Sequence, residues 1–211
     1  MNIKENTIHN DIIAAISTAP GMGAIAVIRL SGKGSIALVD TIFDSPVNKK
    51  LVKQKPYTVH FGKIMDKDTV LDEVLVTLFH APHSFTGEES VEIACHGSIY
   101  IQQKLIEVLI HAGARMAEAG EYTQRAFANG KFDLSQAEAV ADLIASTSAT
   151  AHKVSLNQMR GGFTNKIAKL RDKLLQFVSL IELELDFSEG DVEFANRDTL
   201  MELTIEVESE I

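Results

Sequence analysis

The hydrophobic pattern of this chain changes once, near residue 119, and no other feature constrains the fold more. Before this point apolar residues occur in short runs bounded by glycine, proline and polar turns, which is typical of β-strands. After it they recur every three or four residues, as in amphipathic helices. We therefore predict an α+β protein with two domains, residues 1–119 and residues 120–211.

The first domain is predicted to be an α/β unit. Strands are expected over residues 12–17, 24–30, 57–65, 73–79 and 90–94, and helices over residues 35–43 and 99–112. Asp66-Lys67-Asp68 should join the third and fourth strands as a hairpin. Gly113 should end the second helix, because glycine takes the left-handed C-terminal position without strain.

From Gly120 onward the sequence contains a series of helix start and stop signals. Asn129-Gly130 should end the first helix, and Ser135 with Glu138 offers a capping box for the next. Four apolar residues of this second helix are expected to face inward: Ala137, Val140, Ala141 and Ile144. Gly161-Gly162 should interrupt the pattern before a long helix suited to a bundle, over residues 167–185.

The last segment carries an apolar stripe from Leu200 to Ile211 with no helix stop signal. We expect the second domain to be a partial α-helical bundle that further sequence completes.

Composition favours a folded protein in the cytoplasm. Hydrophobic residues make up 45% of the chain and charged residues 23%, close to the average for globular proteins. No run of about 18 apolar residues is present for a membrane helix, and the first residues lack the apolar core of a signal peptide. Cys95 is the single cysteine, which excludes an internal disulfide and fits a reducing compartment.

The formal net charge of −9 argues against a surface that binds nucleic acid throughout. Basic residues are nevertheless concentrated between Lys153 and Lys173, where the sequence has six basic residues and a single acidic one, Asp172. Such a run is ordinarily a solvated helix face, but it could also contact RNA phosphates.

The short motifs predict no catalytic group and no metal site. Gly21 and Gly23 precede a strand instead of a helix, so they form no dinucleotide loop. His80, His83 and His96 have residue types that suit zinc, but their spacing matches no closed structural site. No serine or cysteine stands beside a base in the pattern of a nucleophile.

Glu92 is a carboxylate among apolar neighbours on a predicted strand. Because side chains alternate along a strand, Glu92 should point away from the face that Val91 and Ile93 share. A half-buried acid needs a partner, whereas an edge-strand glutamate would be hydrated. Both interpretations stay open from composition alone.

Many blocks of this sequence resemble the MnmE (TrmE) family of tRNA-modification GTPases, and together they cover essentially the whole chain. The blocks are Ala19-Pro20-Gly21-Met22-Gly23, Ile28-Arg29-Leu30-Ser31-Gly32, Ser84-Phe85-Thr86-Gly87-Glu88, Glu92, His96-Gly97, Gly120-Glu121-Tyr122-Thr123-Gln124-Arg125-Ala126-Phe127, Asn129-Gly130-Lys131, Asp133-Leu134-Ser135-Gln136-Ala137-Glu138-Ala139 and Asp142-Leu143-Ile144.

The resemblance implies an N-terminal tetrahydrofolate-binding domain similar to that of aminomethyltransferases, followed by a helical domain that a GTPase domain interrupts. Family members form homodimers through the N-terminal domain. With the flavoprotein MnmG (GidA) they add a carboxymethylaminomethyl group to C5 of the wobble uridine of certain tRNAs. The GTPase domain, with its GTP, magnesium and potassium, would be absent from this chain, as would the last helices.

The resemblance also implies a folate site on Arg29, Glu92 and Lys131. The carboxylate of Glu92 could accept a ring N–H and an amino group of a pterin in parallel. Arg29 and Lys131 suit the anionic tail or the formyl oxygen of 5-formyltetrahydrofolate or 5,10-methylenetetrahydrofolate. Arg125 could add a supporting charge, although a helix-surface arginine is the simpler interpretation.

Two other functions remain open at this point. The chain could be a stand-alone folate-dependent protein of the aminomethyltransferase type. Alternatively, the helical half could be an RNA-binding or assembly module, with the α/β half serving only to dimerise. Binding to tRNA that depends on salt and needs no folate would favour the second of these alternatives.

Overall fold

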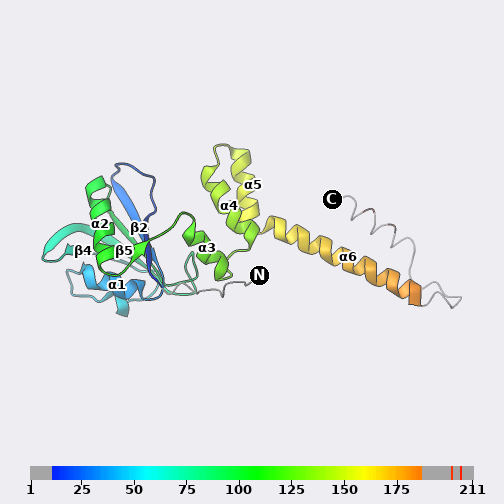
Figure 1. Ribbon diagram of the computed structural model, residues 1–211, viewed down its shortest axis with the longest axis horizontal. Coiled ribbons are helices and arrows are strands. Elements are labelled where there is room, and N and C mark those ends of the chain that lie inside the picture. The colour runs from blue at the N-terminus through cyan, green and yellow to red at the C-terminus, as the bar shows by residue number, and fades with distance from the viewer. Residues whose placement is uncertain (1–10, 187–200, 202–204, 206–211) are drawn as a thin grey trace, which may run out of the picture. The chain divides into compact units, whose positions relative to one another are not determined.

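The computed structural model describes residues 11–186, 201 and 205, and it confirms the predicted α+β class (Figure 1). Contacts divide the chain into two compact units, Met1–Phe132 and Asp133–Ile211. Strand-forming sequence ends near residue 119, as expected. The first unit nevertheless continues through helix α3 (Glu121–Ala128) to Phe132, because buried ion pairs tie α3 to the sheet.

The first unit contains a mixed sheet with the strand order β3-β4-β5-β6-β2-β1-β7. The strands are β1 Ile13–Ile16, β2 Ile25–Ser31, β3 Phe43–Asp44, β4 Val59–Asp66, β5 Thr69–Phe79, β6 Ser90–His96 and β7 Arg115–Met116. All neighbouring strands are antiparallel except β1 and β7. The five predicted strands and the β4–β5 hairpin are confirmed. Strands β3 and β7 escaped prediction because two residues carry no periodicity.

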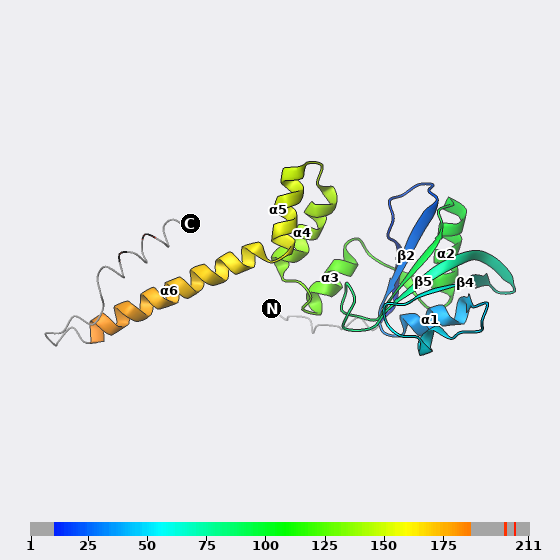
Figure 2. The same cartoon turned by 180° about the vertical axis from the view of Figure 1, so that it is seen from behind.

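Helices α1 (Ser35–Ile42) and α2 (Ile99–His111) pack against one face of this sheet (Figure 2). A short 3-10 helix, Leu51–Lys53, adds to the same core. Alternate residues of each strand face these helices and are fully or almost fully buried. They include Ala26, Ile28 and Leu30 of β2, Val74, Val76 and Leu78 of β5, and Val91, Ile93 and Cys95 of β6.

The opposite face of the sheet stays open within the described part of the chain. Strand register places Val27, Ala94, Leu75 and Phe61 in one row across β2, β6, β5 and β4. The exposed fractions of Leu75 and Phe61 are 47% and 53%, which is high for apolar side chains at the centre of a sheet. We call these four residues the apolar row.

Buried ion pairs hold α3 against the rest of the first unit. Arg125 is 4% exposed, and its guanidinium donates to the carboxylates of Glu121, Asp11 and Glu88 at 3.0, 2.7 and 3.3 Å. Arg115, on β7, donates to both oxygens of Glu121. The interpretation of Arg125 as a helix-surface residue is therefore wrong: Glu121 and Arg125 are four residues apart and share the buried face of α3.

The second unit contains helices α4 (Leu134–Ala145), α5 (Ala149–Met159) and α6 (Gly162–Asp186). The predicted long helix and the break at Gly161, where φ is 82°, are confirmed. Two details of α4 are corrections. Its capping box is formed by Asp133 and Gln136, because a side-chain acceptor already stands directly before Leu134. The side chain that α4 buries is Ala139.

The expected inward direction of Ala141 and Ile144 is likewise wrong, since both are exposed and Ile144 is 82% exposed. Apart from residues 201 and 205, the predicted stripe from Leu200 to Ile211 lies outside the described residues. None of the described helices has the length and apolar character that crossing a membrane requires.

Gly97 and Gly23 bring the end of β6 into contact with the loop that precedes β2. The Gly23 amide donates to the Gly97 carbonyl at 3.0 Å, and the Gly97 amide donates to the Ala24 carbonyl at 3.2 Å. A Cβ atom on Gly97 would overlap the backbone carbonyl of Gly23, whereas a Cβ atom on Gly23 would lie 3.5 Å from its nearest neighbour, the Ile25 carbonyl oxygen.

We therefore predict that Gly97→Ala lowers the free energy of unfolding by about 1–3 kcal/mol, because the backbone must shift to relieve the overlap. Gly23→Ala is the matched control and should change it by much less. Urea unfolding followed by circular dichroism measures both values. Equal effects of the two substitutions would contradict the close contact.

The ion pairs of α3 also predict that the stability of the fold decreases at acid pH. Hydrogen bonds from Arg115 are the main cause that lowers the pKa of Glu121 from 4.5 to about 2. Glu121 binds protons less readily in the folded state, so its contribution to stability is complete above pH 4.5 and is lost as the pH falls towards 2. A difference of this size corresponds to roughly 3 kcal/mol.

We predict that the stability gap between the parent chain and Glu121→Gln narrows by roughly this amount between pH 5 and pH 2.5. Urea unfolding at both pH values measures the gap. Glu107→Gln is the control, because its exposed ion pair with Lys104 should contribute little at either pH. If the stability difference between the parent chain and Glu121→Gln stays constant with pH, the ionised carboxylate of Glu121 does not stabilise the fold.

Candidate functional site

Strands β2 and β6 place Arg29 and Glu92 directly opposite each other on the open face of the sheet. Arg29 Nε and Nη2 both donate to Glu92 Oε1, at 3.0 and 2.7 Å. Each side chain is 29% exposed. Glu92 faces away from Val91 and Ile93, as predicted. The alternative of a hydrated edge-strand glutamate is wrong, since β6 lies between β5 and β2.

Two aromatic rings flank the guanidinium of Arg29. Its central carbon lies 5.5 Å from the centre of the Phe85 ring and 5.8 Å from that of Tyr122, within the range of cation–π attraction. The Tyr122 hydroxyl donates to the Arg29 carbonyl oxygen at 2.5 Å. Burial raises the pKa of Tyr122, so the hydroxyl stays neutral and remains a donor. Arg29 is thus restrained at both its backbone and its side chain.

Lys131 lies beside the loop that carries Phe85. Its Nζ donates to the Pro82 carbonyl oxygen at 3.2 Å, and its side chain passes close to Gly87. The next residue, Phe132, packs edge to face on Phe85 with ring centres 5.5 Å apart. The structure therefore joins Arg29 and Glu92 directly. It places Lys131 beside the loop that carries Phe85, without a hydrogen bond to Arg29 or Glu92 among the described residues.

This loop is fixed by buried polar contacts. Thr86 is fully buried, and its hydroxyl lies 2.7 Å from the hydroxyl of Ser31, which also donates to Glu88 at the same distance. Asn129 donates to the Thr86 carbonyl oxygen at 2.8 Å. The geometry around Phe85 is therefore organised before any ligand arrives.

Phe85 and Tyr122 were missed as site residues by the sequence analysis. Both lie inside blocks that carry the family resemblance. That position was the available signal. Their convergence on Arg29 depends on strand register and on the docking of α3, which local sequence does not encode.

Cys95 and His96 have structural roles in their surroundings. Burial raises the pKa of the Cys95 thiol to about 11, so at neutral pH it stays protonated and unreactive. His96 Nδ1 lies 2.6 Å from Asp72 Oδ1, and Asp72 also accepts the backbone N–H of His96. Within residues 11–186, no three His, Cys, Asp or Glu side chains group closely enough to hold a metal ion.

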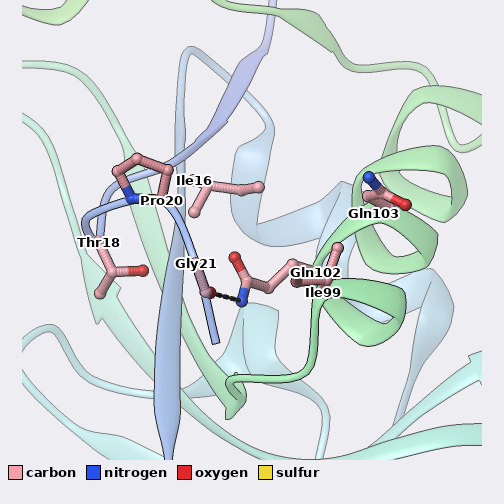
Figure 3. A pocket seen from close by; sticks show the side chains of 7 residues that line it. All are labelled: Ile16, Thr18, Pro20, Gly21, Ile99, Gln102 and Gln103. Atoms are coloured by element: carbon pink, nitrogen blue, oxygen red, sulfur yellow. Dashed lines mark hydrogen bonds between the residues drawn. The ribbon is translucent and has the colours of Figure 1, made fainter. Parts of the chain in front are cut away.

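A separate cavity of about 330 Å³ lies between the loop before β2 and the start of α2 (Figure 3). Seven residues line it, and none is charged: Ile16, Thr18, Pro20, Gly21, Ile99, Gln102 and Gln103. The buried amide of Gln102 donates to the carbonyl oxygens of Gly21 and Gly97, both at 3.1 Å, and so anchors the loop. Without a cation this cavity does not suit an anionic folate.

Comparison with known proteins matches residues 12–131 to the family described as GTP-binding protein TrmE N-terminus, and residues 134–211 to the MnmE helical domain. The tRNA modification GTPase MnmE of Flavobacterium johnsoniae is 57% identical over 201 residues, which is 95% of this chain and 43% of that protein. The MnmE protein of Bacteroides thetaiotaomicron is 58% identical over 204 residues, 96% of this chain and 44% of that protein.

The MnmE protein of Cytophaga hutchinsonii is 52% identical over 201 residues, 95% of this chain and 43% of that protein. The chain thus spans less than half the length of these curated relatives. Its two compact units follow the two matched regions closely, with the change at Phe132 and Asp133. Both matches and the level of identity show that this chain belongs to the MnmE (TrmE) family, whose N-terminal and helical domains it carries.

Proposed function

We propose that this chain is the folate-binding and dimer-forming part of a tRNA-modification GTPase that acts in the cytoplasm. With MnmG it would serve carboxymethylaminomethyl modification at C5 of the tRNA wobble uridine. The names of the relatives support the tRNA-modification part of this proposal. GTP hydrolysis, with magnesium and potassium, would belong to regions of the relatives that this chain does not span, because no complete phosphate-binding loop occurs in these 211 residues.

The single observation that carries the folate proposal is the pair of Arg29 and Glu92 on the open face of the sheet. An ionised carboxylate on a fixed strand can accept an N–H of a pterin, and a charge-assisted hydrogen bond of this kind is strong. Lys131 is a cation at the edge of the loop that carries Phe85, where it would meet the anionic tail of 5-formyltetrahydrofolate or 5,10-methylenetetrahydrofolate.

The apolar row supports the proposal of a homodimer through the first unit. A flat, exposed group that includes Phe61 and Leu75 is the kind of surface that a second copy covers. The row lies directly beside Arg29, Glu92 and Thr77, which form the next row of cross-strand neighbours. A dimer formed here would place the folate site next to the interface.

The charges of the second unit support the proposal that tRNA is a partner. Five basic side chains of α5, α6 and the turn between them are exposed: Lys153, Arg160, Lys166, Lys169 and Arg171. Such a cluster would contact the phosphate backbone and give binding that weakens with added salt.

We predict that Glu92→Ala weakens binding of 5-formyltetrahydrofolate about ten- to a hundredfold, because a hydrogen bond to a charged group is worth roughly 1.5–3 kcal/mol. Glu92→Gln should recover little, since its amide offers a single acceptor atom. Isothermal titration calorimetry measures each affinity, and Glu73→Ala serves as the control on the neighbouring strand.

Lys131→Ala should also weaken binding, and it should flatten the dependence of the affinity on salt, since the variant loses charge attraction. Parent-like affinity of a folded Glu92→Ala protein would show that Glu92 is not the pterin ligand. Absence of binding to the parent chain would contradict the folate proposal as a whole.

For the dimer, we predict that Leu75→Glu converts the chain to a monomer, because it places a charge in the middle of the apolar row. Ile110→Glu is the control: Ile110 is similarly exposed, at 41%, but lies on α2. Sedimentation velocity over a range of concentrations distinguishes the species. A Leu75→Glu protein that remains dimeric would place the interface elsewhere.

A further inference from the structure

The segment between Asp44 and Asp66 contains no acidic residue, although the chain as a whole has 29 acidic and 20 basic residues. Five lysines lie in it: Lys49, Lys50, Lys53, Lys55 and Lys63. The Nζ atoms of Lys50 and Lys63 each lie 3.9 Å from a carboxylate oxygen. The other three lysines are exposed and have no acidic partner among the residues that the structure describes. Positive charge is thus segregated here, within a chain whose net charge is −9.

Buried contacts hold the backbone of this segment in place. Leu51, the first residue of the 3-10 helix, is fully buried, and its amide donates to Asp40 Oδ1 at 2.5 Å. The amide of Gln54 donates to the Leu51 carbonyl oxygen at 3.0 Å and closes the turn. Because Leu51 points into the core, the lysines around it project from a fixed scaffold into solvent.

Side-chain contacts join Lys55 and Lys49 into one surface. The Thr58 hydroxyl donates to the Lys55 carbonyl oxygen at 2.6 Å and lies 2.8 Å from His60 Nε2. Burial lowers the pKa of His60, and the nearby charge of Lys49 lowers it further. At neutral pH the imidazole is therefore uncharged, and the lysines supply the positive charge. We call the following five residues the lysine surface: Lys49, Lys53, Lys55, Tyr57 and His60.

Tyr57 adds a fixed aromatic ring to the lysine surface. Its amide donates to the Leu78 carbonyl oxygen at 2.8 Å, and its hydroxyl donates to the His83 carbonyl oxygen at 2.9 Å. The ring packs edge to face with Phe79, with centres 6.0 Å apart, so this contact leaves at least one ring face uncovered. Tyr57 is 60% exposed, and its φ of 59° is rare for an aromatic residue, which is typical of a functional position.

Fixed cations beside an open aromatic ring suit a nucleic-acid strand whose bases are unstacked. Lysine ammonium groups attract the phosphates, and a base stacks on the ring because every base has a flat π-face. A duplex offers the same phosphates, but its base faces are covered within the stack. An acidic peptide offers negative charge without a base. The lysines and the ring together therefore favour a single strand over both of these partners.

We propose that the lysine surface of the first unit binds a single-stranded segment of RNA, with phosphates on Lys49, Lys53 and Lys55 and one base stacked on Tyr57. The choice of RNA rests on the proposed function in tRNA modification. The lysine surface is distinct from the basic run of α5 and α6, which belongs to the second unit.

Tyr57 also relates the lysine surface to the candidate folate site. The hydroxyl of Tyr57 and the Nζ of Lys131 donate to consecutive carbonyl oxygens, those of His83 and Pro82. Both carbonyls belong to the loop that carries Phe85. A base stacked on Tyr57 therefore lies beside this loop.

The stacked base can be tested directly, because the chain contains no tryptophan. In Tyr57→Trp, titration with oligouridylate should quench the indole fluorescence, since a base then lies on the ring. Tyr100→Trp is the matched control: Tyr100 is 67% exposed, but it lies on α2 outside the lysine surface, so its fluorescence should not change. RNA binding with no quenching in Tyr57→Trp, or with equal quenching in both variants, would overturn the inference.

The lysines are tested in the parent chain, which does not depend on a change at Tyr57. In the double variant Lys53→Gln and Lys55→Gln, the slope of log Kd against log salt should become shallower by about 1.4, because each phosphate contact on a single strand contributes roughly 0.7. Anisotropy of labelled oligouridylate measures the slope. Lys104→Gln is the control, since Lys104 already pairs with Asp66 and Glu107. An unchanged slope in the double variant would contradict phosphate binding here.

Two competitors define the class of partner. Oligouridylate should quench Tyr57→Trp more strongly than an RNA duplex of the same length or polyglutamate does, and equal quenching by either competitor would refute a single-strand site. Oligouridylate that binds without responding to any change in the lysine surface would overturn this inference alone and leave the proposed tRNA partnership intact. If the parent chain bound neither oligouridylate nor tRNA, both would fail. Thermal melting confirms that each variant is folded.

Discussion

The buried pair of Arg125 and Glu121 is the interaction on which the candidate site depends. The contacts of this pair outside α3, from Glu121 to Arg115 and from Arg125 to Asp11, fix one face of the helix, so the residue after Glu121, Tyr122, meets Arg29. The same guanidinium also contacts Glu88, at the end of the loop that supplies Phe85. Burial of these charges is costly and is compensated only while every partner is present. One network therefore sets both aromatic neighbours of Arg29.

Local sequence predicted much of the first unit, because each strand has its own hydrophobic pattern. The hairpin at Asp66-Lys67-Asp68 and the direction of Glu92 followed from turn chemistry and from the alternation of side chains. The residue that pairs with Glu92 could not be predicted from local sequence. Arg29 is 63 residues away, and only the register between β2 and β6 brings the two together. The family resemblance supplied these residue names without the contact between them.

The incorrect predictions from the sequence have a common physical origin. Ser135 and Asp133 are both good capping residues, and the choice between them depends on where the chain leaves Phe132. Ile144 was assigned from its apolar side chain and its spacing in the helix, and Arg125 from its charge. The apolar residue proved exposed and the charged one buried, because neighbouring elements decide burial. Propensity indicates which elements form, whereas tertiary contacts decide which faces are covered.

The protonated thiol of Cys95 has a practical consequence. It lies on the buried face of β6, three residues after Glu92, with its sulfur near the Ala26 carbonyl of β2. Because it faces the core beneath the helices, an alkylating reagent can reach it only when this core opens. Because the chain has a single cysteine, the rate of its modification reports the opening of the core behind the strand pair that holds Arg29 and Glu92. The protein thus contains an intrinsic probe of the local dynamics of its own candidate site.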